Sequence, residues 1–276
     1  MNTPQISVII PLYNKETIIE RTIQSVLRQS FQNFELIIVN DGSTDGSMEV
    51  VRTFHDERII LVEQENGGPG KARNTGVANS HGDWILFLDA DDELAEGALE
   101  HFETLIKHNN GIEMFCCEYL VKKGNELLQP FVYSNEIIDN GFKAWFFRKI
   151  CPRTGATINS RNLVLKCPFN EQIRRYEDLE CLCRMFRYSS ILLSHHVVLT
   201  MNVDFSSASA ARNTICEDFL GHLDFKNKSF WEYMCLYQFY LGEREHYPEK
   251  VKKLYPHLHR RYDLLLLYKV LQRLNR

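Results

Sequence analysis

The first hundred residues alternate buried strands with helices, and this alternation constrains the fold more than any other feature of the chain. Continuous apolar runs, typical of strands covered on both faces, predict strands at residues 6–11, 34–39, 59–62 and 84–88. The intervening segments predict helices at residues 15–29, 45–54 and 69–79. Strands separated by helices form βαβ units, so the sequence predicts an α/β fold with a mixed, mostly parallel sheet flanked by helices.

The second half of the chain is less regular. Hairpin strands are predicted at 113–121 and 125–133, and further strands at 191–193 and 197–201. Helices are expected near 140–149, from Glu177-Asp178, and from about residue 213 onward with interruptions at Pro248 and Pro256. We therefore expect three parts, residues 1–100, residues 101–210 and a helical C-terminal extension at 211–276.

Composition excludes several classes of protein. A net charge of −4 gives no general case for nucleic-acid binding, and no apolar run approaches the roughly 18 residues of a membrane span. The eight cysteines lack the spacing of a metal site, so we expect reduced, mostly buried thiols in a reducing compartment. The first residues lack the basic segment of a signal peptide, so we expect no leader and a cytoplasmic protein.

Polar residues follow three of the predicted strands, at the point where each strand ends. Tyr13-Asn14 follow the first strand, Asp41 the second, and Asp89-Ala90-Asp91-Asp92 the fourth. In open α/β sheets, ligands bind beyond the carboxyl ends of the strands. These polar groups are therefore expected on one rim of the sheet.

The segment Asp89-Ala90-Asp91-Asp92 places three carboxylates within four residues. Burying them without a counter-charge would be costly. A hard cation bound through oxygen atoms removes this cost, and Mg²⁺ or Mn²⁺ that also contacts substrate phosphates is the usual arrangement. The alternative is a solvated acidic loop that caps a helix starting near Leu94. The position at the end of a strand favours the metal site.

A glycine-rich loop followed by two cations indicates an anion site. Residues 67–74 join this loop to a helix N-terminus, where free N–H groups and the side chains of Lys71 and Arg73 favour a phosphate. The loop is not a Walker A motif, because Ala72 replaces the required Ser or Thr.

The position of Asp41 after the second strand can be interpreted in two ways. Its carboxylate could accept a hydrogen bond from N3 of uracil or thymine, a donor that cytosine lacks. Alternatively, Asp41 is a turn residue in Asp41-Gly42-Ser43.

The order of these motifs resembles that of the family 2 glycosyltransferases, which have the Rossmann-like GT-A fold. The resemblance rests on Val8-Ile9-Ile10-Pro11-Leu12-Tyr13-Asn14, Val39-Asn40-Asp41-Gly42-Ser43-Thr44-Asp45, Gly70-Lys71-Ala72-Arg73-Asn74 and Phe87-Leu88-Asp89-Ala90-Asp91-Asp92. It implies inverting transfer of a sugar from a nucleotide diphosphate sugar. The motif Gln-x-x-Arg-Trp of the processive synthases is missing from the sequence, so polymer synthesis by this chain alone is not expected.

The resemblance also implies roles for individual residues. Those that match base-binding positions are Pro11, Tyr13 and Asp41, and those that match nucleoside contacts are Arg73 and Asp89, with Asp89 near the ribose. Asp91 matches the metal ligand of the DxD motif. Asp178, in Glu177-Asp178-Leu179-Glu180, matches the general base. Without the resemblance, Glu177 and Asp178 are equally typical of acidic residues in the first turn of a helix.

We therefore expect a metal-dependent, inverting glycosyltransferase of the hexosyltransferase type that uses a UDP-sugar or dTDP-sugar with Mn²⁺ or Mg²⁺. Residues 1–100 would bind the donor, and residues 101–210 a glycan or lipid-linked acceptor in surface polysaccharide biosynthesis. A sugar-phosphate nucleotidyltransferase is one alternative, but it would have a basic glycine-rich loop where Tyr13-Asn14-Lys15-Glu16 stand. A non-catalytic nucleotide-sugar-binding protein is the other, although all the expected catalytic positions are filled.

The C-terminal segment 247–276 is basic, with eight Lys or Arg against two acidic residues and a net charge of +6. In a helix, one apolar stripe would comprise Leu264, Leu267, Leu271 and Leu274. Because a basic amphipathic helix can lie on an anionic membrane surface, we expect peripheral contact with the inner face of the cell membrane. The alternatives are a helix docked on the acidic remainder of the protein and a homodimer contact.

Overall fold

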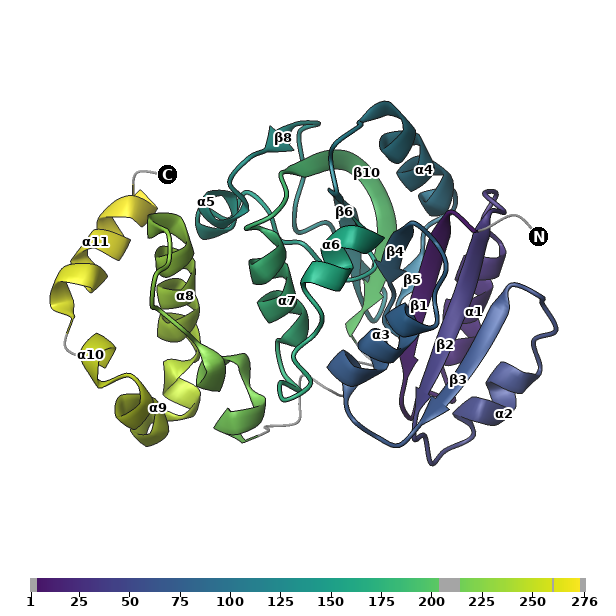
Figure 1. The fold of residues 1–276 in the computed structure, drawn as a ribbon, viewed down its shortest axis with the longest axis horizontal. Coiled ribbons are helices and arrows are strands. Elements are labelled where there is room, and N and C mark those ends of the chain that lie inside the picture. The colour runs from purple at the N-terminus through teal and green to yellow at the C-terminus, as the bar shows by residue number, and fades with distance from the viewer. Residues whose placement is uncertain (1–3, 204–213, 260, 274–276) are drawn as a thin grey trace.

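A computed structural model describes residues 4–203, 214–259 and 261–273 (Figure 1). The strands are β1 (Ile6–Leu12), β2 (Phe34–Asp41), β3 (Ile59–Gln64), β4 (Trp84–Phe87), β5 (Glu93–Leu94), β6 (Met114–Lys123), β7 (Glu126–Leu128), β8 (Ile137–Ile138), β9 (Thr157–Ser160) and β10 (Ile191–Asn202). The α-helices are α1 (Ile19–Leu27), α2 (Ser47–Arg52), α3 (Pro69–Ala78), α4 (Ala98–His108), α5 (Gly141–Phe146), α6 (Arg161–Lys166), α7 (Glu177–Met185), α8 (Phe230–Glu243), α9 (Pro248–Leu254), α10 (Pro256–His259) and α11 (Tyr262–Arg273).

The described strands form one mixed sheet with the order β3-β2-β1-β4-β9-β6-β10-β5. The neighbours β3, β2, β1 and β4 are parallel, and so are β6 and β10. The short strand β9 runs antiparallel between β4 and β6 and joins these two parallel portions into one sheet. This confirms the predicted mixed, mostly parallel sheet flanked by helices.

Both faces of the sheet are covered, which explains the continuous apolar runs of its central strands. In β1, Val8 and Ile10 face a core shared with α1, α2 and α4. Ile9 points to the opposite core, to which α3, α6 and α7 contribute. Alternate residues of one strand therefore pack in different layers, so a polar residue in the middle of such a strand would face an apolar layer on either side.

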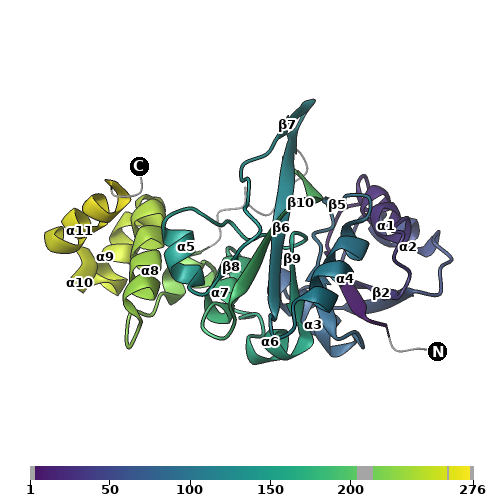
Figure 2. The same cartoon turned by 90° about the horizontal axis from the view of Figure 1, so that it is seen from above.

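The second core extends beyond the sheet into the C-terminal helices, which stand beside α5 at one end of the molecule (Figure 1). Helix α8 contributes Met234, Tyr237 and Tyr240 to this core, and each of these side chains is buried. Viewed from above, the hairpin of β6 and β7 projects away from the sheet (Figure 2). The predicted helical C-terminal extension is confirmed, and it shares its core with the rest of the chain.

Three predicted elements differ from the structure. The helix expected near Leu94 begins at Ala98, because Glu93–Leu94 pair with β10 as β5 and Gly97 then turns the chain with a φ of 73°. The two strands expected at 191–193 and 197–201 are one strand, β10, with register shifts between Ser194 and Leu199. The second hairpin strand, expected at 125–133, is paired only over Glu126–Leu128.

The predicted interruptions of the C-terminal helical region at Pro248 and Pro256 are confirmed, because one helix ends shortly before each proline and the next begins at it. Pro248 is the first residue of α9 and Pro256 the first of α10, positions where the missing N–H costs nothing. No helix among the described residues is long and apolar enough to span a membrane. All eight cysteines are free, and six of them are buried, as expected of reduced thiols in a core.

Candidate active site

The structure places the predicted polar residues on one rim of the sheet. Parallel pairing of β1 with β2 and with β4 brings Tyr13, Asp41 and Asp89 to neighbouring strand ends. The ring of Tyr13 is 47% exposed, so it is available for stacking, whereas Pro11 is half-buried within β1. The base-binding roles of these residues stay predictions.

The carboxylate of Asp41 is buried and anchors the glycine-rich loop. Its Oδ1 accepts hydrogen bonds from Gln64 Nε2 at 2.7 Å and from the Gly67 N–H at 2.8 Å, and its Oδ2 accepts one from the Gly68 N–H at 2.8 Å. The turn that follows β2 is instead closed by Asn40, whose Oδ1 accepts from the Ser43 N–H at 2.9 Å. A carboxylate offers about four acceptor positions, so Asp41 has capacity for a further donor.

Two cations lie against the glycine-rich loop. A Cβ added at Gly67 would stand 2.2 Å from Lys71 Cδ, so the Lys71 side chain crosses the loop where only glycine leaves room. Gly68 has a φ of 88°, and a Cβ there would stand 3.3 Å from Arg174 Cγ. The start of α3 is therefore flanked by positive charge, which favours an anion, although the N–H groups of Gly67 and Gly68 already donate to Asp41. Sequence reasoning missed Arg174, because it lies more than a hundred residues from the loop.

Arg73 joins the two halves of the site. Its Nη2 is 2.6 Å from Asp89 Oδ1 and its Nη1 is 2.7 Å from Glu177 Oε1, although Arg73 and Glu177 are 104 residues apart. The Arg73 side chain is 4% exposed, and its guanidinium lies 5.2 Å from the centre of the Phe169 ring. The rim of the sheet and the start of α7 are thus held together by one buried cation.

Burial and charge determine the protonation of this network. Burial raises the pKa of Glu177 to about 7, an effect that Arg73 opposes and that the neighbouring Asp178 carboxylate increases. Burial disfavours the charged form of Arg73, but the carboxylates of Asp89 and Glu177 raise the pKa of its guanidinium further above its usual range. Arg73 therefore remains charged at neutral pH.

Asp178 is the second residue of α7 and lines a small cavity beneath the rim. The cavity has a volume of about 20 Å³, room for a single water molecule. Its polar lining consists of Asp178, Arg153, Thr154, Thr157 and Asn159. Arg153 Nε and Asn159 Oδ1 are buried and have no hydrogen-bond partner in the described part of the chain.

Thr154 connects this cavity to the acidic motif, because its hydroxyl donates to Asp89 Oδ2 at 3.1 Å. The structure therefore brings Asp178 near Asp89 and Arg73, and the roles of these residues stay predictions. It also adds Arg153 and Asn159, which sequence reasoning missed because a lone Arg in a loop and a lone Asn in a short strand carry no motif.

The three carboxylates of the acidic motif point in different directions. Asp91 Oδ2 pairs with Lys15 Nζ at 2.7 Å, whereas Asp92 Oδ1 accepts a hydrogen bond from the Asn202 N–H at 2.9 Å. Burial and the charge of Asp89 raise the pKa values of both Asp91 and Asp92. The alternative of a helix cap near Leu94 is therefore wrong, because Asp92 is buried at the end of β10 and α4 begins at Ala98.

A metal ion fits this motif only together with a ligand. Among the described residues, no three His, Cys, Asp or Glu side chains are grouped so that they could hold an ion by themselves. Asp91 and Asp89 nevertheless offer hard oxygen donors beside the cationic loop, and Mg²⁺ is commonly held by one or two carboxylates plus substrate phosphates. Sequence reasoning missed Lys15, although it directly follows the Tyr13-Asn14 pair.

Comparison with known proteins gives a consistent result. The family model described as "Glycosyl transferase family 2" matches residues 7–162. Glycosyltransferase GlyA of Streptococcus pneumoniae is 42% identical over 105 residues, which are 37% of this chain and 15% of GlyA. An uncharacterized glycosyltransferase of Haemophilus influenzae is 46% identical over 103 residues, 36% of this chain and 41% of that protein. The chain thus covers less than half the length of these two relatives.

Longer matches occur at lower identity. An uncharacterized glycosyltransferase of Rickettsia typhi is 28% identical over 225 residues, 78% of this chain and 69% of that protein. The structure of S. aureus TarS 1–349 in complex with UDP-GlcNAc superposes with a TM-score of 0.72 at 21% identity, covering 87% of this chain and 73% of that one. The mannosyltransferase PcManGT from Pyrobaculum calidifontis, in complex with GDP-Man and Mn²⁺, gives 0.64 at 15% identity over 99% and 84% of the two chains. At these identities the structures show a shared fold alone.

Proposed function

This chain belongs to glycosyl transferase family 2, and from that membership we propose that it transfers a hexose from a UDP-sugar, or a dTDP-sugar, to a glycan or lipid-linked acceptor with inversion. The observation that carries the proposal is the Arg73 bridge, which brings Asp89 of the rim and Glu177-Asp178 of α7 to one place. A glycan or lipid-linked acceptor would place the reaction in surface polysaccharide biosynthesis.

The preference for uracil or thymine rests on Asp41 and Tyr13. Asp41 retains acceptor capacity toward an N3–H donor, and the exposed ring of Tyr13 offers a stacking surface at the neighbouring strand end. The structural neighbours bind different nucleotides, since TarS is described with UDP-GlcNAc and PcManGT with GDP-Man. The base preference is therefore a proposal about this chain's own residues.

In the proposed reaction, Asp178 accepts the proton of an acceptor hydroxyl while the oxygen attacks the anomeric carbon. The bond between this carbon and the diphosphate breaks, and its electron pair leaves with UDP. Glu177 and Asp178 are the first two residues of α7, and their carboxylates would repel each other if both were ionised. Arg73 reduces this repulsion because its guanidinium pairs with Glu177. Lys71 and the N–H groups at the start of α3 would face the negative charge of the diphosphate.

We include a divalent cation, Mn²⁺ or Mg²⁺, in this proposal. Asp91, with Asp89 beside it, would hold the ion together with diphosphate oxygens, and the bound ion would neutralise charge that develops on the leaving group. The Lys15 ammonium, 2.7 Å from Asp91, compensates the same carboxylate in the free protein. A bound ion would share Asp91 with Lys15 or take the place of its ammonium.

Contact with an anionic membrane surface is the second part of the proposal. On α11, Leu264, Tyr268 and Leu271 pack against the core, so part of the predicted apolar stripe docks on the protein; Leu274 lies outside the described residues. The opposite face exposes Leu266 and Val270 by 65% and 44%, next to the exposed cations Lys269 and Arg273, and Leu267 of the predicted stripe is 37% exposed at its edge. This outward face, and not the predicted stripe, is the surface that we propose meets lipid; a homodimer contact remains the alternative.

Release of UDP from a panel of UDP-sugars and dTDP-sugars tests the proposed activity. We expect one sugar to give UDP or dTDP release that EDTA abolishes and Mn²⁺ restores. Asp178→Asn should lower this release roughly 10²- to 10⁴-fold while UDP binding persists. Release of pyrophosphate instead would indicate a nucleotidyltransferase, and binding without release would indicate a non-catalytic protein.

A further inference from the structure

Helix α8 of the C-terminal region is tied to both ends of α7, the helix that carries Glu177 and Asp178. The residues that precede α7, Arg175 and Tyr176, contact Glu243 at the last turn of α8. The residue Arg187, just beyond α7, contacts Glu232 at the first turn of α8. We use the name "α8 clamp" for these five residues.

The contacts at the start of α7 are buried and charged. Arg175 Nη2 lies 3.2 Å from Glu243 Oε2, and the Tyr176 hydroxyl donates to Glu243 Oε1 at 3.0 Å. Arg175 Nη1 lies 2.9 Å from Asp218 Oδ2, and Asp218 is fully buried. The Tyr176 ring also packs edge-on against Phe239 of α8, with 5.2 Å between the ring centres. Each partner is partly or fully removed from water, so these contacts are screened less than surface ion pairs.

The backbone of the same segment is held by the C-terminal region. The N–H groups of Arg174 and Arg175 donate to the Glu217 carbonyl at 2.7 and 3.1 Å, and the Phe219 N–H donates to the Arg175 carbonyl at 3.2 Å. A parallel β-bridge thus pairs Arg175 with Asp218. The segment leading into α7 therefore depends on chain that is distant in sequence.

Tyr176 adopts a backbone conformation that needs this support. Its φ of 63° lies in the left-handed region, which is strained for any residue other than glycine. This left-handed residue caps α7, and the next two residues are Glu177 and Asp178. The direction in which α7 begins, and hence the position of the Asp178 carboxylate at the cavity, is set at Tyr176.

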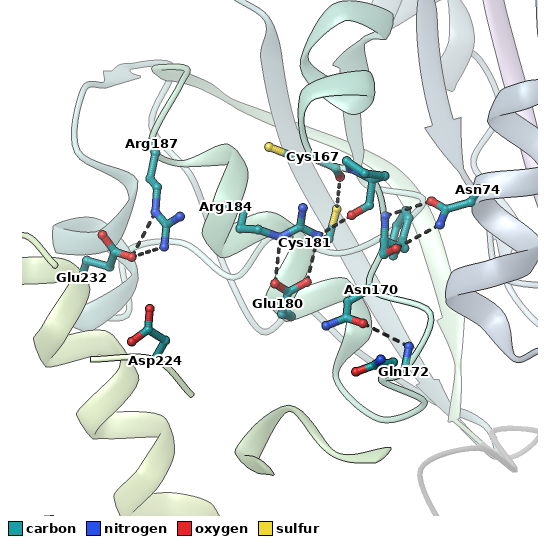
Figure 3. A network of polar contacts seen from close by, with 12 residues as sticks. Asn74, Cys167, Asn170, Gln172, Glu180, Cys181, Arg184, Arg187, Asp224 and Glu232 are labelled. Carbon is teal, nitrogen blue, oxygen red and sulfur yellow. Dashed lines mark hydrogen bonds and ion pairs between the residues drawn. The ribbon is translucent and has the colours of Figure 1, made fainter. Parts of the chain in front are cut away.

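The far end of α7 is held by the same helix. Figure 3 shows Arg187 beside Glu232, with Arg187 Nε 3.0 Å from Glu232 Oε1. The Glu232 side chain is buried, and Lys228 Nζ lies 3.4 Å from the same oxygen. Because Glu232 and Glu243 are eleven residues apart on α8, the clamp holds α7 at both of its ends relative to α8.

We propose that Glu243 is a positioning residue for the transfer reaction: through Tyr176 and Arg175 it fixes the strained turn that aims Asp178 at the cavity. The proposal rests on the proposed function of Asp178 as the base. It assigns the C-terminal helical region a part in catalysis, although no residue of α8 lines the cavity.

Two substitutions and one control separate positioning from general stability. Glu243→Gln keeps the shape of the side chain and one acceptor but removes the charge that faces Arg175, and Tyr176→Phe removes only the donated hydroxyl. Glu245→Gln makes the same chemical change at an exposed position two residues along the chain. All three are measured in the full chain by hydrogen exchange of a peptide covering residues 174–186, by UDP affinity, and by kcat and KM for the nucleotide sugar most active in the panel.

We expect Glu243→Gln and Tyr176→Phe to speed hydrogen exchange at 174–186 and to lower kcat roughly 10- to 100-fold, with KM and UDP affinity within about twofold of the wild type. The double variant should be little worse than either single variant, because both substitutions loosen the same turn at Tyr176 through contacts that share Glu243. The control should match the wild type in every measurement.

Unchanged exchange and kcat in both single variants would overturn the proposal. So would a parallel loss of kcat and UDP affinity, because that result indicates general loss of structure. If the wild type releases UDP from no sugar of the panel, the proposed function fails, and the exchange measurement alone still decides whether Glu243 holds the start of α7.

Discussion

Glu177 shows how one buried side chain can make the stability of the whole protein depend on pH. Burial raises its pKa from the ordinary value of 4.5 to about 7, so between these values the folded protein keeps a proton that the unfolded chain releases. The stabilising contribution of protonated Glu177 to the free energy of unfolding is therefore fully present below pH 4.5 and is lost as the pH rises through 7. The slope is at most about 1.4 kcal/mol per pH unit for one proton.

Glu177→Gln removes this titration while keeping a side chain of similar size beside Arg73. We expect the free energy of unfolding of the wild type to fall relative to that of the variant as the pH rises from 5 to 7.5. Urea unfolding of both proteins across this range measures the difference. A difference that is constant with pH would mean that Glu177 is already ionised at pH 5 in the folded protein.

Asp41 has a structural duty as well as its predicted role in base recognition. Asp41→Ala would leave the N–H groups of Gly67 and Gly68 without their acceptor, so we expect the free energy of unfolding to fall by about 1–3 kcal/mol without any nucleotide. Thermal or urea unfolding of the nucleotide-free variant measures this loss. Stability equal to that of the wild type would mean that the loop does not depend on Asp41.

The role of Asp41 in base recognition is tested separately on the wild type. We expect UDP to bind more tightly than CDP, because uracil offers an N3–H donor and cytosine does not. Calorimetric titration with the two nucleotides measures the ratio of their dissociation constants. Equal affinities would remove Asp41 from base recognition while leaving its part in the loop intact.

Residues in local motifs were predictable from the sequence, and residues in long-range contacts were not. Tyr13, Asp41 and Asp89 follow apolar runs directly, so their common rim follows from strand order alone. Lys15 pairs with Asp91, which is 76 residues away, and Arg153 lines the cavity beside Asp178. No spacing in the sequence encodes such contacts. The left-handed φ of Tyr176 is equally invisible, because Tyr rarely adopts it without tertiary support.

At the level of single elements, glycines reveal where a helix lies against the sheet. A Cβ added at Gly76 of α3 would stand 2.3 Å from Ile9 Cγ2 in β1, so the helix approaches the strand more closely than any side chain allows. Gly242 of α8 has nothing within 4 Å of the same position. The two residues therefore differ sharply in packing, although Gly76 lies inside α3 and Gly242 in the last turn of α8.

Gly76→Ala and Gly242→Ala should have opposite effects on stability. We expect Gly76→Ala to destabilise the protein by about 1–3 kcal/mol through overpacking, and Gly242→Ala to stabilise it by about 0.5–1 kcal/mol through helix propensity. Urea unfolding at neutral pH measures both. If Gly76→Ala is neutral or stabilising, α3 does not pack on β1 as closely as described.

Elements with strong periodicity were predicted, and those formed by tertiary pairing were not. The apolar runs of β1, β2 and β4 and the amphipathic face of α1 identify these elements directly. Strand β9 reads Thr157-Ile158-Asn159-Ser160, with no apolar run, and exists because β4 and β6 pair with it on either side. The start of α4 was misplaced because the pairing of β5 with β10 outweighs the local helix signals near Leu94.

At the scale of the whole molecule, charge is unevenly distributed. Residues 247–276 have a net charge of +6, whereas the whole chain has a net charge of −4, so the remainder of the chain has a net charge of −10. The segment is also held by apolar packing, since α11 packs its Leu264, Tyr268 and Leu271 side on the core. Removing the whole segment would therefore expose core, and point substitutions on the outward face are the cleaner probe.

The last prediction concerns this outward face. Each cation near an anionic bilayer contributes about 1 kcal/mol of attraction, and the exposed side chains of Leu266 and Val270 add apolar contact. We expect the wild type to pellet with anionic liposomes at low salt and to be released at high salt. Lys269→Glu combined with Arg273→Glu should abolish pelleting. Arg28→Glu with Lys107→Glu makes the same change of net charge just beyond α1 and on α4, and should not abolish it. Because both double variants carry the same net charge, a difference between them can only arise from where the charges lie. Absence of pelleting by the wild type at low salt would instead make α11 a packing element or a contact between two copies of the chain.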